Sequence, residues 1–146
     1  MIEYKDNFTF NFMCTLYFDG CSKGNPGPAG SGAIIKNETN LDIIWSGSEN
    51  IGNDTNNVAE YKGLILGLKH CMQGKYLIKG DSMLIINQMN GKYKVNSPHL
   101  LILHNEAKQI IKDKNLDVTF HYIPRAENKE ADQLANDGLK QPLVSD

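Results

Sequence analysis

The chain has 146 residues, of which 40% are hydrophobic and 22% are charged, and its formal net charge is −2. This length and composition support one domain with its own core, and no apolar stretch is long enough to span a membrane. The weak negative charge argues against a nonspecific nucleic-acid binder, which is usually basic. It is compatible with an enzyme whose acidic site recruits divalent cations.

The first predicted element is a strand over residues 13–19, with apolar side chains on both faces, as in a central strand that is covered on both sides. It ends at Asp19, and a loop rich in glycine and proline follows at once, from Gly20 to Pro28. Two further strands are predicted at residues 30–36 and 41–47, joined by a short polar turn. Together the three strands form an antiparallel meander.

A helix is predicted next, because capping residues at 54–57 precede apolar residues that recur at helical spacing up to Met72. Gly63 and Gly67 lie one turn apart beside that apolar stripe. Glycine costs about 1 kcal/mol in a helix interior relative to alanine, so two of them indicate that this helix packs very close to the sheet. Glu60 lies on the flank that the two glycines share.

Five more elements are predicted from hydrophobic periodicity and from helix-start signals: a strand at 76–80 that ends in Asp81, a helix capped by Asp81 or Ser82, a helix from Ser97–Pro98, a strand at 116–123, and a helix at 131–138 with Asp132 on its flank. A meander followed by alternating strands and helices implies an α/β fold, in which a mixed five-stranded sheet carries helices on both faces.

Residues 1–12 lack the basic flank and the continuous apolar segment of a secretory signal. We expect a short arm there, a single domain within residues 1–146, and a tail at 139–146. The three cysteines, Cys14, Cys21 and Cys71, are an odd number without C-x-x-C spacing. That pattern argues against a disulfide framework and a structural zinc site, so we expect a reducing, cytoplasmic location. Nothing demands a partner subunit, and we expect a monomer.

Four carboxylates lie at element boundaries or helix flanks: Asp19, Glu60, Asp81 and Asp132. If they met in space unpaired, their repulsion would be severe, and divalent cations would relieve it. Oxygen-only ligands favour Mg²⁺ or Mn²⁺ over zinc, and two such ions about 3.5–4 Å apart promote in-line displacement at phosphorus. Each carboxylate taken singly is more often a turn or capping residue, so the residues alone leave both interpretations open.

Four motifs of the chain resemble type 1 ribonuclease H, in the order of that family and over residues 13–138. They are Tyr17-Phe18-Asp19-Gly20 with Gly24-Asn25-Pro26-Gly27-Pro28, Thr55 to Tyr61, Lys79-Gly80-Asp81-Ser82, and Tyr122 to Ala135. The resemblance implies the ribonuclease H-like fold, in which the fourth and fifth strands run parallel to the first. It also implies an endoribonuclease that hydrolyses the RNA strand of RNA–DNA hybrids and leaves 3′-hydroxyl and 5′-phosphate ends.

The resemblance further implies that Asp19, Glu60, Asp81 and Asp132 bind two Mg²⁺ or Mn²⁺ ions, and that Asp19 bridges them. Glu60 and Asp81 would bind one ion and Asp132 the other. Glu60 would also contact a 2′-hydroxyl, the group that distinguishes RNA from DNA. The residues that match hybrid-binding positions of the family lie in the first loop and at the first helix start: Gly20, Ser22, Asn25, Thr55, Asn56 and Asn57.

The chain departs from the family pattern in two places. Many members carry a histidine in the loop before the last acidic residue, whereas residues 124–129 hold Arg125, as in a subset of members. Arginine stays protonated and cannot be a general base, so we expect Arg125 to bind the scissile phosphate or the product. The segment 90–97 is also short where some members insert a basic protrusion, which predicts weaker substrate binding.

Two other interpretations stay open beside this one. A DNA nuclease or resolvase of the same superfamily would keep the fold and change the substrate. A catalytically silent hybrid-binding or scaffold domain would bind the hybrid without cleaving it. Four unpaired acids that face a polyanion argue against this interpretation, because they bring no benefit to a protein that only binds. We expect an RNA–DNA hybrid as the partner and no membrane association.

Overall fold

The computed structural model describes residues 13–143, so the arm expected at residues 1–12 lies outside the described residues. The elements are the strands β1 (Met13–Ser22), β2 (Gly27–Asn37), β3 (Ile43–Asp54), β4 (Lys75–Gly80) and β5 (Asp117–Tyr122), and the helices α2 (Asn56–Lys69), α3 (Met83–Met89), α4 (Pro98–Asp113), the 3₁₀ turn η1 (Arg125–Glu127) and α5 (Lys129–Gly138). Among these helices, none has both the length and the apolar character needed to cross a membrane.

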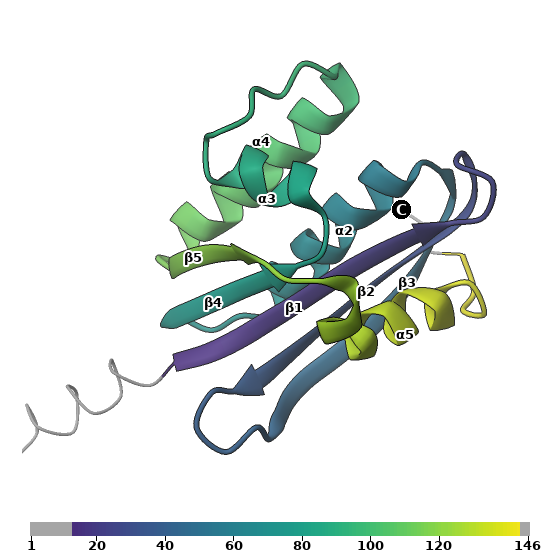
Figure 1. The fold of residues 1–146 in the computed structure, drawn as a ribbon. Coiled ribbons are helices and arrows are strands. Elements are labelled where there is room, and N and C mark those ends of the chain that lie inside the picture. The colour runs from purple at the N-terminus through teal and green to yellow at the C-terminus, as the bar shows by residue number, and fades with distance from the viewer. Residues whose placement is uncertain (1–12, 144–146) are drawn as a thin grey trace, which may run out of the picture.

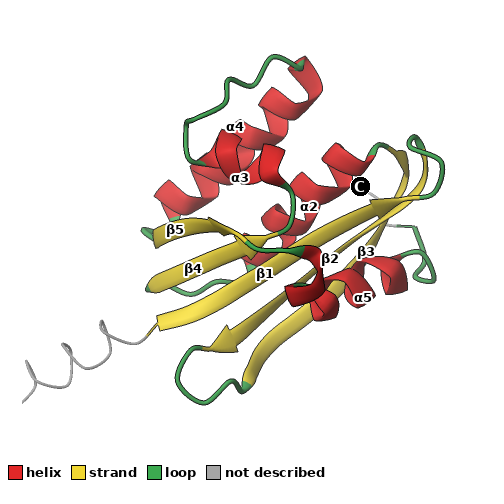
Figure 2. Cartoon of the chain, in the orientation of Figure 1, coloured by secondary structure: helices red, strands yellow, loops and turns green. Residues whose placement is uncertain are grey.

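The five strands form one mixed sheet in the order β3-β2-β1-β4-β5. β1 pairs antiparallel with β2, and β2 pairs antiparallel with β3, whereas β4 is parallel to both β1 and β5. Figure 2 shows the sheet as a twisted layer with β1 at its centre. The predicted meander and the parallel crossover strands are confirmed, and so is the α/β class.

The bounds of the first strands differ from the prediction. β1 does not end at Asp19, because the residues up to Ser22 continue to pair with β2. Its pairing with β4 stops earlier, at Tyr17 opposite Lys79. Asp19 therefore lies inside β1, on a stretch where β1 keeps a neighbour on one side only. The Asp19 side chain is nevertheless buried.

Helices cover both faces of the sheet, as expected (Figure 1). Neighbouring residues of β2 make the division clear, because side chains alternate between faces along a strand. A Cβ on Gly32 would meet Leu134 and Ala135 of α5, whereas the Ala33 side chain lies against Gly67 of α2. α4 packs against α2 on that same face. α5 therefore covers one face, and α2 with α4 covers the other.

α2 approaches β1 very closely, as its two glycines predict. A Cβ on Gly63 would lie 2.4 Å from the Asp19 carbonyl oxygen, and one on Gly20 would lie 2.2 Å from the Ala59 carbonyl carbon. Both distances are too short for any side chain, so glycine at both positions lets the helix backbone rest on the strand backbone. This contact brings Glu60 beside Asp19.

The segment after α5 returns to the sheet on the β3 side. Leu143 forms an isolated parallel bridge with Asn50, and the Asn50 side-chain amide donates a hydrogen bond to the Gln141 carbonyl at 3.1 Å. The described part of the expected tail, residues 139–143, is thus tied to β3.

Candidate active site

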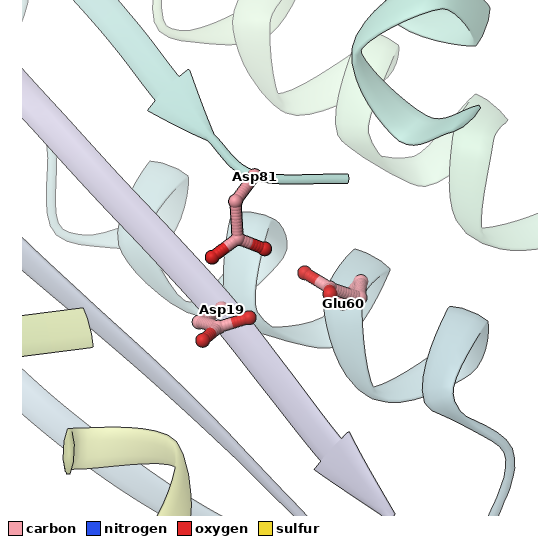
Figure 3. A group of neighbouring side chains, drawn as sticks. All are labelled: Asp19, Glu60 and Asp81. Carbon is pink, nitrogen blue, oxygen red and sulfur yellow. The ribbon is translucent and has the colours of Figure 1, made fainter. Parts of the chain in front are cut away.

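Three of the predicted carboxylates come together at the centre of the sheet. Asp19 lies in β1, Glu60 in the second turn of α2, and Asp81 directly after β4. One carboxylate oxygen from each residue lies within 4.8 Å of the other two. Figure 3 shows the three side chains converging on one small space from a strand, a helix and a strand end. Segments far apart in the sequence therefore build a single acidic group, which we call the carboxylate triad.

Burial makes this acidic group electrostatically costly. Asp19 is 4% exposed and Glu60 is also buried. Burial, followed by the charge of Asp81, raises the pKa of Asp19 to about 7, although the Gly20 N–H donates to its carboxylate at 2.9 Å. Burial and then the charge of Asp19 raise the pKa of Glu60 well above its usual range. The triad therefore resists carrying its full negative charge unless a cation neutralises it.

The donor set fits a hard divalent cation. All three groups offer carboxylate oxygens, which is the ligand type that such cations prefer. The Glu60 Oε1 atom is buried and has no hydrogen-bond partner in the described part of the chain. A buried acceptor without a partner is normally costly. A bound cation would satisfy that oxygen and relieve the repulsion within the triad.

Asp132 lies beside the triad without joining it. It belongs to the first turn of α5, and it lines the same cleft of about 440 Å³ as Asp19, Glu60 and Asp81. Its nearest cation is Arg125, whose Nη2 atom lies 3.8 Å from the Asp132 Oδ1 atom. The Arg125 side chain is 81% exposed and lines the cleft too. All four predicted acids and the arginine thus share one cleft, with three acids packed together.

The six residues predicted to bind the hybrid fall on two adjoining surfaces. Three of them line the cleft of the triad: Gly20, Ser22 and Asn56. The other three line a hollow of about 630 Å³ between the starts of α2 and α4: Asn25, Thr55 and Asn57. The Asn25 side-chain oxygen accepts the Asn56 backbone N–H at 2.9 Å and joins the two surfaces. Their contact with a substrate stays a prediction.

Some of these side chains also hold the local structure. The Ser22 hydroxyl donates to the Asp54 carbonyl at 2.7 Å, which ties the end of β1 to the end of β3. The Thr55 hydroxyl caps α2 by accepting the Val58 N–H at 3.3 Å. The loop after β1 and the start of α2 are therefore fixed to each other.

Four other residues line the cleft, and none of them was predicted as a site residue: Cys21, Lys23, Tyr122 and Asn136. The Lys23 Nζ atom donates to the Asn136 side-chain oxygen at 3.2 Å, and the Asn136 amide donates to the Asp132 carbonyl at 2.9 Å. Asn136 lies one helical turn after Asp132, and that spacing is the signal that could have placed it beside the site.

A mixed five-stranded sheet in this order, with acids from β1, α2 and the end of β4 at its centre, defines a ribonuclease H-like domain. The chain belongs to the reverse transcriptase-like family, whose model matches residues 17–138. The matched range contains all four predicted carboxylates. The ribonuclease H-like family and fold that the four motifs imply are confirmed, and the type 1 subset stays a prediction.

Similar solved structures support this assignment. The N-terminal RNase H domain of a Mycobacterium tuberculosis protein, fused to maltose-binding protein, has a TM-score of 0.82 and 38% identity, covering 88% of this chain and 94% of that one. LC11-RNase H1 in complex with an RNA/DNA hybrid has a TM-score of 0.81 and 35% identity, covering 87% and 96%. RNase H1 of Halobacterium salinarum NRC-1 has a TM-score of 0.80 and 34% identity, covering 88% and 98%.

Curated relatives include longer proteins. A bifunctional protein of Mycobacterium tuberculosis is 40% identical over 124 residues, which are 83% of this chain and 34% of that protein. Ribonuclease HI of Halobacterium salinarum is 36% identical over 126 residues, which are 84% of this chain and 62% of that protein. The chain thus spans about a third of the length of the first of these relatives.

Proposed function

We propose that this chain is a metal-dependent endoribonuclease that hydrolyses the RNA strand of RNA–DNA hybrids. The observation that carries the proposal is the carboxylate triad, whose oxygens lie within 4.8 Å of one another in a cleft. LC11-RNase H1, which is 35% identical and was solved with an RNA/DNA hybrid, supports the choice of substrate. We assign the whole activity to one catalytic domain, acting as a monomer in the cytoplasm.

Asp19, Glu60 and Asp81 would hold a divalent cation, and Asp132 would contribute a ligand to a second one. We propose Mg²⁺ or Mn²⁺, because the donors are all oxygens. When bound, such ions activate a water molecule and neutralise charge that develops on the phosphate. In the hydrolysis, the water oxygen bonds to phosphorus and the bond to the 3′ oxygen breaks. The products are a 3′-hydroxyl, once that oxygen has taken a proton, and a 5′-phosphate.

The protein's own groups position the substrate around that reaction. Arg125 is exposed at the rim of the cleft, and its permanently charged guanidinium would bind the scissile phosphate or the 5′-phosphate product. Glu60, in the second turn of α2, would also accept a hydrogen bond from a ribose 2′-hydroxyl. That contact would select RNA as the strand that is cut.

The hollow between the starts of α2 and α4 would hold the DNA strand. The start of α2 presents Thr55 and Asn57 to this hollow, and Asn25 faces it from the loop after β1. Hydroxyls, amides and the N–H groups of a helix start suit phosphate oxygens. Gly20, Ser22 and Asn56, which line the cleft of the triad, would contact the hybrid between the two strands.

The test is cleavage of matched labelled substrates by the purified protein. An RNA–DNA hybrid, a DNA duplex and an RNA duplex of one sequence are incubated with Mg²⁺, Mn²⁺ or a chelator. We expect the RNA of the hybrid to be cut at internal positions, only with a divalent cation, to 5′-phosphate ends. Cleavage of duplex DNA instead would indicate a DNA nuclease, and hybrid binding without cleavage in any metal would indicate a silent binding domain. Either result would overturn the proposal.

A further inference from the structure

Asn128 is a buried amide that lies directly behind the carboxylate triad. It is 1% exposed and lies between η1 and α5. Its Nδ2 group donates one hydrogen bond to the Phe18 carbonyl in β1 at 2.9 Å and one to the Asp81 Oδ2 atom at 3.2 Å. Both amide hydrogens are therefore used, one on β1 and the other on the residue directly after β4.

The place of this amide explains why two donors are needed. The pairing of β1 with β4 stops at Tyr17 opposite Lys79. Beyond that point the two described segments are no longer paired. The Asn128 amide lies at this opening and connects the residue before Asp19 to the Asp81 side chain. It links the two segments where their pairing has ended, which is also where the triad lies.

The backbone of Asn128 extends the same connection to the other side of the cleft. Its N–H donates to the Arg125 carbonyl at 3.0 Å, and its carbonyl accepts the Asp132 N–H, also at 3.0 Å. One residue thus has direct hydrogen bonds to Asp81, to Asp132 and to the turn that carries Arg125. A shift of Asn128 would move groups on both sides of the cleft together.

The orientation of the amide is fixed by its partners. Rotation by 180° would place the Oδ1 atom against the Phe18 carbonyl and the Asp81 carboxylate, which offer only acceptors. In the observed orientation Oδ1 is buried and has no hydrogen-bond partner in the described part of the chain. An unpartnered buried acceptor costs stability. A hydrophobic side chain could fill this space without an unpartnered acceptor. The two hydrogen bonds that the amide donates therefore explain why an asparagine is present.

We propose that Asn128 is a positioning residue, which holds the Asp81 carboxylate against β1 at the distance from Asp19 that a shared divalent cation requires. The inference rests on the proposed function. An amide suits this task because it donates to a carboxylate without a charge. An aspartate there would repel Asp81, and a lysine would compete with the cation. Residues that orient metal ligands in this way commonly affect metal affinity or activity by about 10- to 100-fold when they are changed.

The test compares Asn128→Ala and Asn128→Asp with Asn90→Ala. Asn128→Asp keeps the shape and removes the donors, so it separates donation from space filling. Asn90 also donates to a strand carbonyl, that of Phe120 at 3.3 Å, but it contacts no carboxylate. For each protein we measure Mn²⁺ affinity by calorimetry without hybrid, and then the Mg²⁺ concentration for half-maximal cleavage, kcat and KM for the hybrid.

We expect both Asn128 variants to bind Mn²⁺ about 10- to 100-fold more weakly and to need correspondingly more Mg²⁺, with KM for the hybrid within about twofold of the original value. Asn90→Ala should retain the original metal dependence. Unchanged Mn²⁺ affinity in folded Asn128→Ala would overturn the proposal, and so would metal binding by Asn128→Asp equal to that of the original chain.

A measurement on the unmodified protein covers the case in which the Asn128 variants do not fold. In a ¹⁵N-labelled sample, the side-chain amide signals of Asn128 should shift on addition of Mg²⁺ with the same midpoint as the backbone signals of Asp19 and Asp81. Signals that do not move while those of the triad do would overturn the proposal. Failure of the proposed function gives a different result. In that case the original chain would bind Mn²⁺, Asn128→Ala would bind it more weakly, and neither protein would cut the hybrid.

Discussion

Asp19 is a buried carboxylate whose negative charge is unfavourable where it lies. It is nearly inaccessible, and it faces two other acids. Burial and the Asp81 charge raise its pKa to about 7 from an ordinary value of 3.8. A carboxylate in this state stabilises the fold poorly, and the cation that we propose it binds would explain its presence in the core of β1.

The first prediction concerns the pH dependence of stability without metal. Between about pH 4 and pH 7 the folded protein retains the Asp19 proton that the unfolded chain has released, so the free energy of unfolding falls as the pH rises through this range. We expect the Tm in a chelator to drop between pH 5 and pH 7.5. About 1 kcal/mol shifts the Tm of a domain of this size by roughly 2–4 °C, and added Mg²⁺ should recover the loss at the higher pH.

Asp19→Asn should weaken this slope and raise the metal-free Tm at pH 7.5, because it removes one buried charge from the triad. Asp117→Asn is the control, since Asp117 is an exposed acid at the start of β5. A Tm in chelator that is flat or that rises over the same pH range would contradict the assignment of a repulsive triad.

The second prediction concerns Arg125, the only arginine of the chain. Arg125→Ala should lower kcat on the hybrid by roughly two- to tenfold, as loss of one exposed charged contact allows. Its neighbour Lys129 is exposed and does not line the cleft, so Lys129→Ala should leave kcat unchanged. Equal kinetics for Arg125→Ala and the original chain would make Arg125 an ordinary surface residue.

At the scale of the elements, the contact of α2 with β1 sets the geometry of the triad. Gly63→Ala tests this contact, because the new Cβ would lie 2.4 Å from the Asp19 carbonyl oxygen. Helix propensity alone predicts that the change stabilises the helix by about 1 kcal/mol. We expect the opposite sign, namely a lower Tm and weaker Mn²⁺ binding, since the helix and Glu60 must move away from β1. A Tm that rises with unchanged metal affinity would contradict the close packing.

The starts of α2, α3 and α4 were predictable from the sequence because their signals are local. Thr55, Ser82 and Ser97 each cap the helix that follows, and Pro98 occupies its first turn. The strand bounds were less predictable. β3 extends to Asp54 through polar residues and glycines, and β2 begins at Gly27, because both are held by pairing with a neighbouring strand. That pairing leaves no local pattern.

In the candidate site, too, some features have a signal in the sequence and others depend on contacts between distant residues. The resemblance to a known family predicted one site built from Asp19, Glu60, Asp81 and Asp132, because it rests on motifs that are visible in the sequence. The structure brings the first three together, with Asp19 inside β1 rather than at its end. The part that Asn128 plays was not predictable. Its hydrogen bonds join residues 110 and 47 positions away in the chain, and only the folded sheet brings them into contact.

At the scale of the whole molecule, the charge balance limits how the chain binds nucleic acid. It has 15 basic and 17 acidic residues, and the segment between α3 and α4 is short. Each phosphate contact adds about 0.9 to the slope of log affinity against log salt. We measure the hybrid affinity of the Asp19→Asn variant with Mg²⁺ by fluorescence anisotropy at several salt concentrations. We expect a salt dependence that corresponds to fewer than about six phosphate contacts. A steeper slope would indicate an extended basic surface.

The central claim is that the carboxylate triad performs metal-dependent cleavage of RNA in a hybrid. Its most direct test is the cleavage rate of Asp19→Asn beside that of the original chain, on one labelled hybrid at saturating Mg²⁺, with circular dichroism to establish that both are folded. We predict that the original chain cuts the RNA strand and that folded Asp19→Asn shows no detectable cleavage. A near-original rate in the variant would contradict the account.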